Sequence, residues 1–299
     1  MTDTHSVAVS SATRGQGGLS PVAKRRIAAV IKHVILIAVG FVMIFPLLWM
    51  VSSSLKPDED IFKGIQLIPT TWDLNNYKEG WYAQTYTFGH YMMNSLIITV
   101  LAIIGNLISC SMAAYGFARL KWRGRSLCFS FMMMTLMLPF YVTIVPQYIM
   151  WSKLDLVNTF VPMVLPKFLA TDAFFVFLMV QFFRGLPTEL DEAAEVDGAG
   201  FGRIFFQILL PNALPSLATT GIFTFINTWN DFFSQFLYLT KPQNLTATVA
   251  LRNFSDATSG TSWGPLFAMS TLSLIPLFIV FLFGQKYLVE GSATTGMKG

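Results

Sequence analysis

The sequence predicts an all-α integral membrane protein with six transmembrane helices. Its apolar composition, its long charge-free runs and the placement of its basic residues support this prediction. Of the 299 residues, 54% are hydrophobic and 12% are charged, and the mean hydropathy is +0.56. The charged share is about half that of a typical soluble domain. The composition therefore excludes a soluble globular enzyme, a disordered chain, a disulfide scaffold and a nucleic-acid-binding protein.

Runs without Asp, Glu, Lys or Arg mark the expected spans. They are 33–55, 80–118, 126–152, 204–230 and 257–285, and a further apolar region near 157–183 is interrupted by Lys167 and Asp172. Each run exceeds the roughly 20 residues that a helix needs to cross a bilayer. The runs are continuously apolar, which favours helices over a β-barrel. The expected spans are 29–54, 93–117, 127–150, 159–182, 213–238 and 265–288.

The basic residues predict the orientation of these spans. Cytoplasmic loops are enriched in Lys and Arg, and positions 119–125 carry four such residues, Arg119, Lys121, Arg123 and Arg125. This pattern predicts a domain over 27–299 with both termini cytoplasmic and with the 55–92 and 239–264 loops outside. Residues 1–26 are predicted to form a disordered cytoplasmic tail, because they begin with a stretch rich in Ser, Thr, Ala and Gly.

The largest expected cytoplasmic loop, 184–211, predicts a short helix outside the membrane. Thr188 is a good N-cap residue, and Asp191 three positions later resembles the partner in a capping box. Acidic residues suit the first turn, alanines favour the helix, and Gly198 is a natural terminator. We expect a helix over about 189–197. A simple interfacial connector is one alternative, but the acidic surface favours docking on a protein over resting on an anionic leaflet.

One spacing within this loop resembles a known family. Glu192-Ala193-Ala194 is followed by Gly198 and then, after nine intervening residues, by Ile208-x-Leu210-Pro211. The pattern resembles the cytoplasmic "EAA" loop of binding-protein-dependent ABC importer permeases. Other segments resemble the smaller six-span permease of maltose-type carbohydrate transporters: Ser54–Pro57, Pro69, Asn76-Tyr77, Thr228–Asp231, Gln285–Gly291 and Gly296–Gly299. The resemblance covers about residues 27–299.

The resemblance implies a type I ABC importer permease fold in the bacterial inner membrane. It implies a non-catalytic subunit that binds no cofactor or metal, while ATP and Mg²⁺ bind to partner ATPase subunits. Two such ATPase subunits, a second related permease and an extracytoplasmic sugar-binding protein are the implied partners, with lipid around the spans and no nucleic acid. The implied docking residues are Glu192, Ala193, Ala194, Asp197 and Gly198, supported by Thr188, Ile208, Leu210 and Pro211.

Polar residues inside the expected spans are further candidates. Asn227, Asn230 and Asp231 stand at positions i, i+3 and i+4 of the fifth span, and Trp229 lies among them. They predict either a wall of the translocation path or a hydrogen-bonded seam between helices. In the fourth span, a structural ion pair between Lys167 and Asp172 is favoured over a proton relay.

Three other functions fit the sequence less well. An ion-coupled secondary carrier acting alone would need intramembrane carboxylates, and Asp172 and Asp231 are the candidates; this alternative leaves the acidic loop unexplained. An intramembrane enzyme lacks a nucleophile–base or metal motif, because GxxxxGK[ST], HExxH and GxSxG are all missing from the sequence. A structural scaffold would not need the EAA spacing.

Overall fold

The computed structural model describes residues 21–256 and 260–296, and the described chain is mostly helical. Two compact units are formed by residues 1–49 and 50–299, and each is considered by itself. Most of the predicted 1–26 tail, together with residues 297–299, lies outside the described residues. Residues 21–26 of that tail are helical, contrary to the prediction of disorder. The physical reason is that Pro21 is well suited to a first helical turn and the Lys and Arg that follow are good helix formers.

The first unit contains most of one long apolar helix, α1 (Pro21–Ser53). Its stretch Arg25–Ser53 is long and apolar enough to cross a membrane. Its side chains are largely exposed in this chain. The last turn of α1 belongs to the second unit.

The second unit consists of many helices, several of them short, and one small hairpin. Their bounds are α2 (Asp58–Ile61), α3 (Asn75–Tyr82), α4 (Phe88–Ala118), α5 (Arg125–Thr135), α6 (Phe140–Lys153), α7 (Val161–Val164), the 3₁₀ helix η1 (Leu165–Leu169), α8 (Ala173–Gly185), α9 (Glu189–Val196), α10 (Phe201–Arg203), the π-helix η2 (Ile204–Leu209), α11 (Leu210–Asn212), α12 (Leu214–Trp229), α13 (Phe233–Tyr238), the 3₁₀ helix η3 (Pro242–Asn244), α14 (Ala247–Arg252) and α15 (Trp263–Gly296). Strands β1 (Ser255–Asp256) and β2 (Gly260–Thr261) pair antiparallel.

Four stretches of the described chain are long and apolar enough to be membrane spans. They are Arg25–Ser53, Phe88–Ala118, Val161–Gly185 and Trp263–Tyr287, and two bent helix pairs raise the possible number to 6. These four stretches overlap the predicted spans 29–54, 93–117, 159–182 and 265–288. The described part of the chain therefore has 4 to 6 candidate spans.

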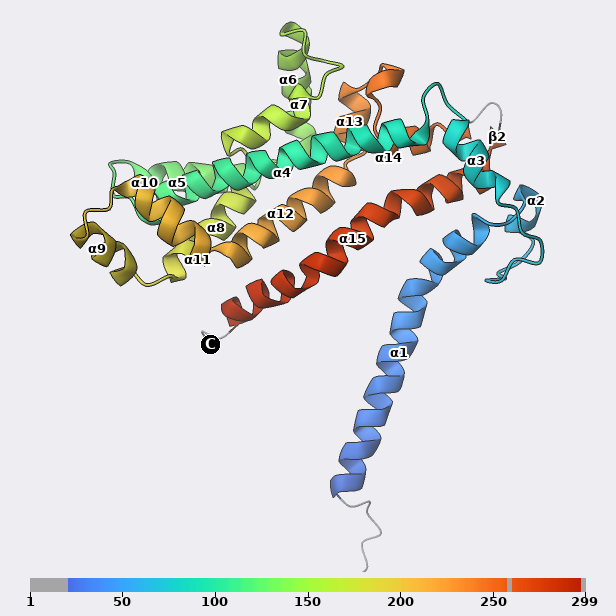
Figure 1. Cartoon of the computed structure of the whole chain (residues 1–299), viewed down its shortest axis with the longest axis horizontal. Coiled ribbons are helices and arrows are strands. Elements are labelled where there is room, and N and C mark those ends of the chain that lie inside the picture. Colours follow the sequence, from blue (N-terminus) through green and yellow to red (C-terminus); the bar gives the residue numbers. More distant parts are fainter. Residues whose placement is uncertain (1–20, 257–259, 297–299) are drawn as a thin grey trace, which may run out of the picture. The chain divides into compact units, whose positions relative to one another are not determined.

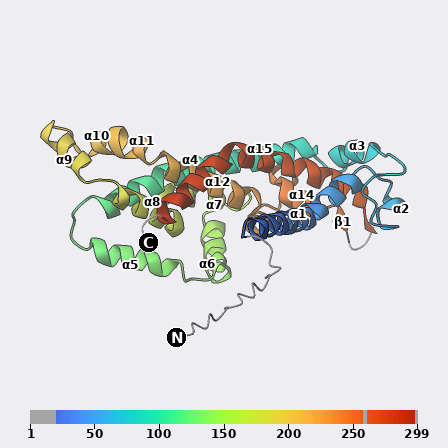
Figure 2. The same ribbon diagram turned by 90° about the horizontal axis from the view of Figure 1, so that it is seen from below.

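The other two predicted spans differ from the single helices expected. In place of one helix over 127–150, α5 and α6 meet at 100° (Figure 2). The break lies just before Pro139, which lacks a backbone N–H and disfavours a helical residue before it. In place of one helix over 213–238, α12 ends at Trp229 and a separate short helix, α13, follows. The segment Phe201–Asn212 is bent by 76° from α12, next to Pro211 and Pro215.

Helix α4 is the centre of the packing in this unit. It packs against α8 and α12, and α12 packs against α15; these helices run side by side in both views (Figures 1 and 2). One apolar cluster contains Phe88 and Tyr91 near the start of α4, and a second contains Cys110 and Tyr115 near its end. Because α4 contributes to both clusters, it connects the two ends of the unit.

Asn76 and Tyr77 hold the predicted outer loop 55–92 to the end of α1. Asn76 Nδ2 donates to the carbonyl oxygens of Ser54 at 3.1 Å and Lys56 at 2.8 Å. The Tyr77 hydroxyl lies 2.8 Å from Ser54 Oγ. A Cβ at Gly264, on the first turn of α15, would collide with the Asn76 side chain. The structure thus brings together the Ser54–Pro57 and Asn76-Tyr77 segments that the sequence singled out separately.

Candidate functional site

The short helix α9 stands on the predicted cytoplasmic loop and confirms the helix expected near 189–197. It spans Glu189–Val196 and ends where Gly198 adopts φ +77°. The N–H of Ala199 donates to Ala194 O at 2.9 Å, and that of Gly198 donates to Glu195 O at 3.0 Å. This pair of bonds defines a Schellman motif, whose left-handed position favours glycine. Gly198 therefore fixes the end of the helix by its backbone conformation.

The predicted capping box is wrong. Thr188 occupies the N-cap position but its side chain makes no capping hydrogen bond. The Asp191 carboxylate is instead directed to Arg119, with 3.3 Å between Asp191 Oδ2 and Arg119 Nε. The physical reason is that a charge-assisted contact with a buried guanidinium is stronger than a bond to a neutral backbone N–H. The competing partner comes from α4, far from Asp191 in the sequence.

Burial changes the acidity of Asp191. Burial raises the pKa of its carboxyl above the ordinary aspartate value; the Arg119 guanidinium opposes this rise, and the Glu195 carboxylate adds to it. Asp191 and Arg119 also line an open pocket of about 440 Å³. Because the pocket is open, the Asp191 carboxyl can exchange protons with the surrounding solvent.

The two alanines of α9 face different surroundings. Ala194 is 8% exposed and belongs to the apolar cluster that also contains Tyr115, Phe183 and Phe205. Ala193 is exposed. Ala194 therefore packs within its own chain, whereas Ala193 is open to solvent.

One face of α9 remains open. Among the predicted docking residues, Glu192, Ala193, Asp197 and Gly198 are exposed. Val196, which the sequence reasoning missed, is 88% exposed and lies at i+3 and i+4 from Ala193 and Glu192. An exposed valine on an amphipathic helix is the signal that could have identified it. The open face is therefore acidic, with small apolar side chains.

The supporting residues of the loop lie on both sides of α9. Ile208 and Leu210 are half-buried and pack against the apolar cluster that contains Ala194. Thr188 and Pro211 are exposed. The first two therefore pack beside the buried side of α9, whereas the second two lie at the surface of the loop.

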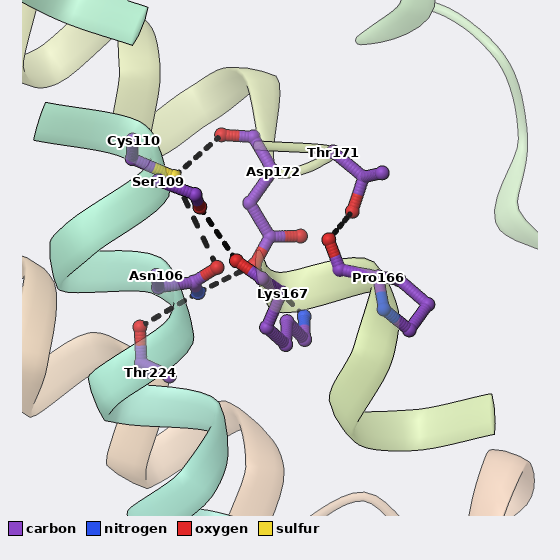
Figure 3. Close-up of polar contacts among 8 residues, drawn as sticks. All are labelled: Asn106, Ser109, Cys110, Pro166, Lys167, Thr171, Asp172 and Thr224. Carbon is purple, nitrogen blue, oxygen red and sulfur yellow. Dashed lines mark hydrogen bonds and ion pairs between the residues drawn. The ribbon is translucent and has the colours of Figure 1, made fainter. Parts of the chain in front are cut away.

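A second polar site lies inside the helix packing (Figure 3). The Lys167 ammonium and Asp172 Oδ2 are 2.8 Å apart, which confirms the predicted ion pair. Asn106 of α4 donates to the same Asp172 oxygen at 2.6 Å and to Thr224 Oγ1 of α12 at 3.0 Å. Ser109 Oγ donates to Lys167 O at 2.6 Å. This polar cluster joins α4, α12 and the segment that leads from η1 into α8.

A backbone break allows Lys167 to reach Asp172. Ala170 adopts a left-handed conformation with φ 52° between η1 and α8, so the two residues do not lie on one continuous helix. Sequence reasoning found the ion pair but missed Asn106 and Thr224. The available signal was an asparagine within a charge-free apolar run, because a buried amide needs partners.

The four residues around Trp229 do not form one face. The indole is buried, stacks on Phe225 at 5.5 Å, and donates through Nε1 to Ser273 O of α15 at 3.1 Å. Trp229 thus belongs to the predicted helix seam. Because α12 ends there, Asp231 accepts the Ser234 N–H at 3.0 Å and caps the following turn. Asn227 and Asn230 are exposed.

Within the described ranges, no group of three or more His, Cys, Asp or Glu residues is placed to hold a metal ion. The described chain instead combines several apolar spans with an acidic helix on an inter-span loop. This combination indicates a multi-pass membrane protein.

The comparisons with known proteins identify the family. Residues 105–291 match the family described as "Binding-protein-dependent transport system inner membrane component", and the chain belongs to it. It is similar to the probable ABC transporter permease protein YurM of Bacillus subtilis, with 35% identity over 85% of this chain and 84% of that protein. It is also similar to the diacetylchitobiose uptake system permease protein NgcG of Streptomyces coelicolor, with 33% identity over 91% of this chain and 89% of that protein.

The fold has a solved counterpart. A chain in the crystal structure of a bacterial ABC transporter involved in the import of the acidic polysaccharide alginate matches with a TM-score of 0.78. The match has 23% identity and covers 88% of this chain and 97% of that chain. This likeness shows the fold. The family to which the chain belongs makes it a non-catalytic, multi-pass permease subunit of a binding-protein-dependent ABC transporter in the inner membrane.

Proposed function

We propose that this chain forms half of the pore of a carbohydrate importer. A second related permease forms the other half, and an extracytoplasmic binding protein delivers the sugar. The carbohydrate class is supported by a relative named for diacetylchitobiose uptake and by a structural counterpart named for alginate import. Transport is driven by two cytoplasmic ATPase subunits, which bind the ATP and Mg²⁺.

In this proposal the chain has six spans. Each bent pair, α5 with α6 and the Phe201–Asn212 segment with α12, counts as one span. An even number places both termini on the same side. The basic cluster at 119–125 and the loop that carries α9 then lie in the cytoplasm, as the positive-inside rule favours.

The open face of α9 is the observation that carries the docking proposal. It presents Glu192, Ala193, Val196 and Asp197, so a partner can approach the backbone closely and offer a basic group to the carboxylates. Gly198 holds the following turn, and Ile208 and Leu210 support the helix from its own chain. A short rigid helix held in this way acts as a lever, because a push on it displaces the spans on either side.

The residues around the end of α12 have a separate role. Asn227 and Asn230, both exposed, are proposed to face the translocation path, where amides can hydrogen-bond sugar hydroxyls. Trp229 and Asp231 are proposed to hold the geometry of this segment through their bonds to Ser273 and Ser234. The polar pair therefore stands beside a fixed helix end.

Affinity purification from gently solubilised native membranes tests the proposal. The tagged chain should bring down an ATPase subunit and a second permease. Glu192→Lys should lose the ATPase while retaining the second permease. The matched control is Glu79→Lys, the same charge change at an exposed position of α3, and it should retain both partners. Recovery of the wild-type chain alone, or only as a homo-oligomer, would overturn the proposal in favour of an ion-coupled carrier.

A further inference from the structure

The cytoplasmic end of α4 holds the α9 loop at three points. Arg119, the C-cap residue of α4, donates through Nη2 to Leu186 O at 2.9 Å, and its Nε lies 3.3 Å from Asp191 Oδ2. The Tyr115 hydroxyl donates to Phe201 O at 3.2 Å. These three partners lie before, within and after α9. We call Tyr115, Arg119 and their partners Leu186, Asp191 and Phe201 the α4 clamp.

The clamp is built from buried polar groups. The Arg119 side chain is 7% exposed and the Asp191 side chain is 17% exposed. A guanidinium can serve two partners in fixed directions, which a lysine ammonium on a flexible stem does not reproduce. Its charge also suits the carboxyl end of the α4 helix.

Apolar contacts reinforce the clamp. The Tyr115 and Phe205 rings lie 5.2 Å apart, and Ala194 belongs to the same buried cluster. The α9 loop therefore rests on α4 through packing as well as through hydrogen bonds. The clamp leaves the open face of α9 free.

Helices α9 and α4 are not neighbours along the sequence, so no short covalent connection joins them. Its loop is covalently continuous with α8 on one side and with the segment leading into α12 on the other. Motion of α9 reaches these two helices directly, but it reaches α4 only through non-covalent contacts. Helix α4 is nevertheless the one on which α8 and α12 both pack. A lever tied only to α8 and α12 would shear them against α4.

We infer that Arg119 is a positioning residue for transport, which links the movement of α9 to α4 so that α4, α8 and α12 move together. This inference rests on the proposed docking of an ATPase on α9. A buried ion pair is weak evidence for stability, because desolvation offsets the attraction. Its value here is geometric, since it fixes the angle between the lever and the central helix.

The test uses the purified importer in proteoliposomes, with the binding protein and radiolabelled diacetylchitobiose as the first probe. The variants are Arg119→Ala, Arg119→Lys and Asp191→Ala. The matched control is Arg123→Ala, because Arg123 carries the same charge in the same cluster and is exposed. Sugar uptake and ATP hydrolysis are measured on the same vesicles, and a pull-down measures retention of the ATPase.

The clamp variants should keep the ATPase and continue to hydrolyse ATP. Sugar moved per ATP should fall by roughly tenfold, within the usual range of coupling between sites, while Arg123→Ala should match the wild type. The exchanged pair Arg119→Asp with Asp191→Arg should recover part of the loss. This split between hydrolysis and uptake would not follow from a general loss of folding.

The opposite outcomes are distinct. Clamp variants that transport as much sugar per ATP as the wild type would overturn this inference and leave the proposed function intact. Loss of ATPase retention in Arg119→Lys would also overturn it, because α4 would then be needed for docking and not for transmission. Wild-type vesicles that show no ATP-driven uptake of any tested oligosaccharide would count against the proposed function instead.

Discussion

Asn106 Nδ2 lies 2.6 Å from Asp172 Oδ2, and the same amide donates to Thr224 at 3.0 Å. Asn106 is fully buried, so one side chain connects α4 to both helices that pack on it. Removing either side of such a buried hydrogen bond lowers the free energy of unfolding, because no water replaces the lost partner. This connection explains why α4 contains a polar residue in the middle of an apolar run.

Asn106→Leu should destabilise the helix packing. The substitution keeps a similar size but leaves Asp172 and Thr224 without their donor, at a cost of about 1–3 kcal/mol. The measurement is the thermal unfolding midpoint of the detergent-solubilised complex. Asn227→Leu, at an exposed position of α12, is the control and should leave the midpoint unchanged. Equal midpoints for both variants would show that the polar cluster contributes nothing.

The Lys167–Asp172 pair should behave as a structural pair. Lys167→Met leaves the Asp172 carboxylate with Asn106 and without a countercharge, which should cost about 1–3 kcal/mol given that the two side chains are 27% and 25% exposed. The double variant with Asp172→Asn should recover most of the lost stability. Thermal unfolding of the two variants gives the comparison.

The same variants test for a proton relay. A structural pair predicts that the double variant keeps the wild-type pH profile of sugar uptake. A profile that flattens or shifts in the double variant would identify Lys167 and Asp172 as a proton pathway and revive the ion-coupled carrier.

Substitution by leucine should have different effects at Ala193 and at Ala194, the two alanines of α9. Ala194→Leu adds volume to a packed cluster and should destabilise the loop by about 1–3 kcal/mol. Ala193→Leu adds volume on the open face, so it should preserve the unfolding midpoint and weaken ATPase retention. Unfolding and pull-down are measured on both variants. If Ala193→Leu retained the ATPase as strongly as the wild type does, the ATPase would have to dock on another face of the chain.

The Asp191 carboxyl should produce a pH-dependent difference in stability. Its pKa is raised in the folded protein by burial, with Arg119 opposing and Glu195 adding to the rise; the Tyr115 hydroxyl also faces this group. A raised pKa means that the folded state binds the proton more tightly than the unfolded chain does. The stability contributed by Asp191 therefore falls as the pH rises from the unfolded pKa through the raised one.

Asp191→Asn provides the measurement. The variant keeps an acceptor oxygen for Arg119 but cannot ionise, so its unfolding midpoint should exceed that of the wild type at neutral pH. The difference should close as the pH falls below the ordinary aspartate pKa. A wild-type advantage at neutral pH that shrinks on acidification would mean that attraction to Arg119 outweighs burial.

Local signals in the sequence predicted local structure well. The alanines and Gly198 predicted a helix within the 184–211 loop, and the structure confirms it as Glu189–Val196. The length of the apolar runs predicted four of the span-like stretches, although Lys167 and Asp172 interrupt one of them. These features depend on neighbours within a few turns, which a single sequence displays directly.

Competition from distant residues explains the errors. Asp191 was assigned to Thr188 because the partner three residues away is visible, whereas Arg119 reaches it only in the fold. Ala194 could not be distinguished from Ala193, because burial depends on α4 and η2. Pro139 is a local signal for a break, but the uninterrupted apolar run 126–152 around it favours a single span.

The central claim is that this chain belongs to an ATP-driven transporter, and the most direct test is to measure which energy source drives transport. The purified complex is reconstituted in vesicles with ATP inside and the binding protein outside, and the uptake of a panel of radiolabelled oligosaccharides that includes diacetylchitobiose is followed. The account predicts uptake that requires ATP and the binding protein and persists when ionophores collapse the proton and sodium gradients. Uptake by this chain alone, without ATP and abolished by those ionophores, would contradict the account.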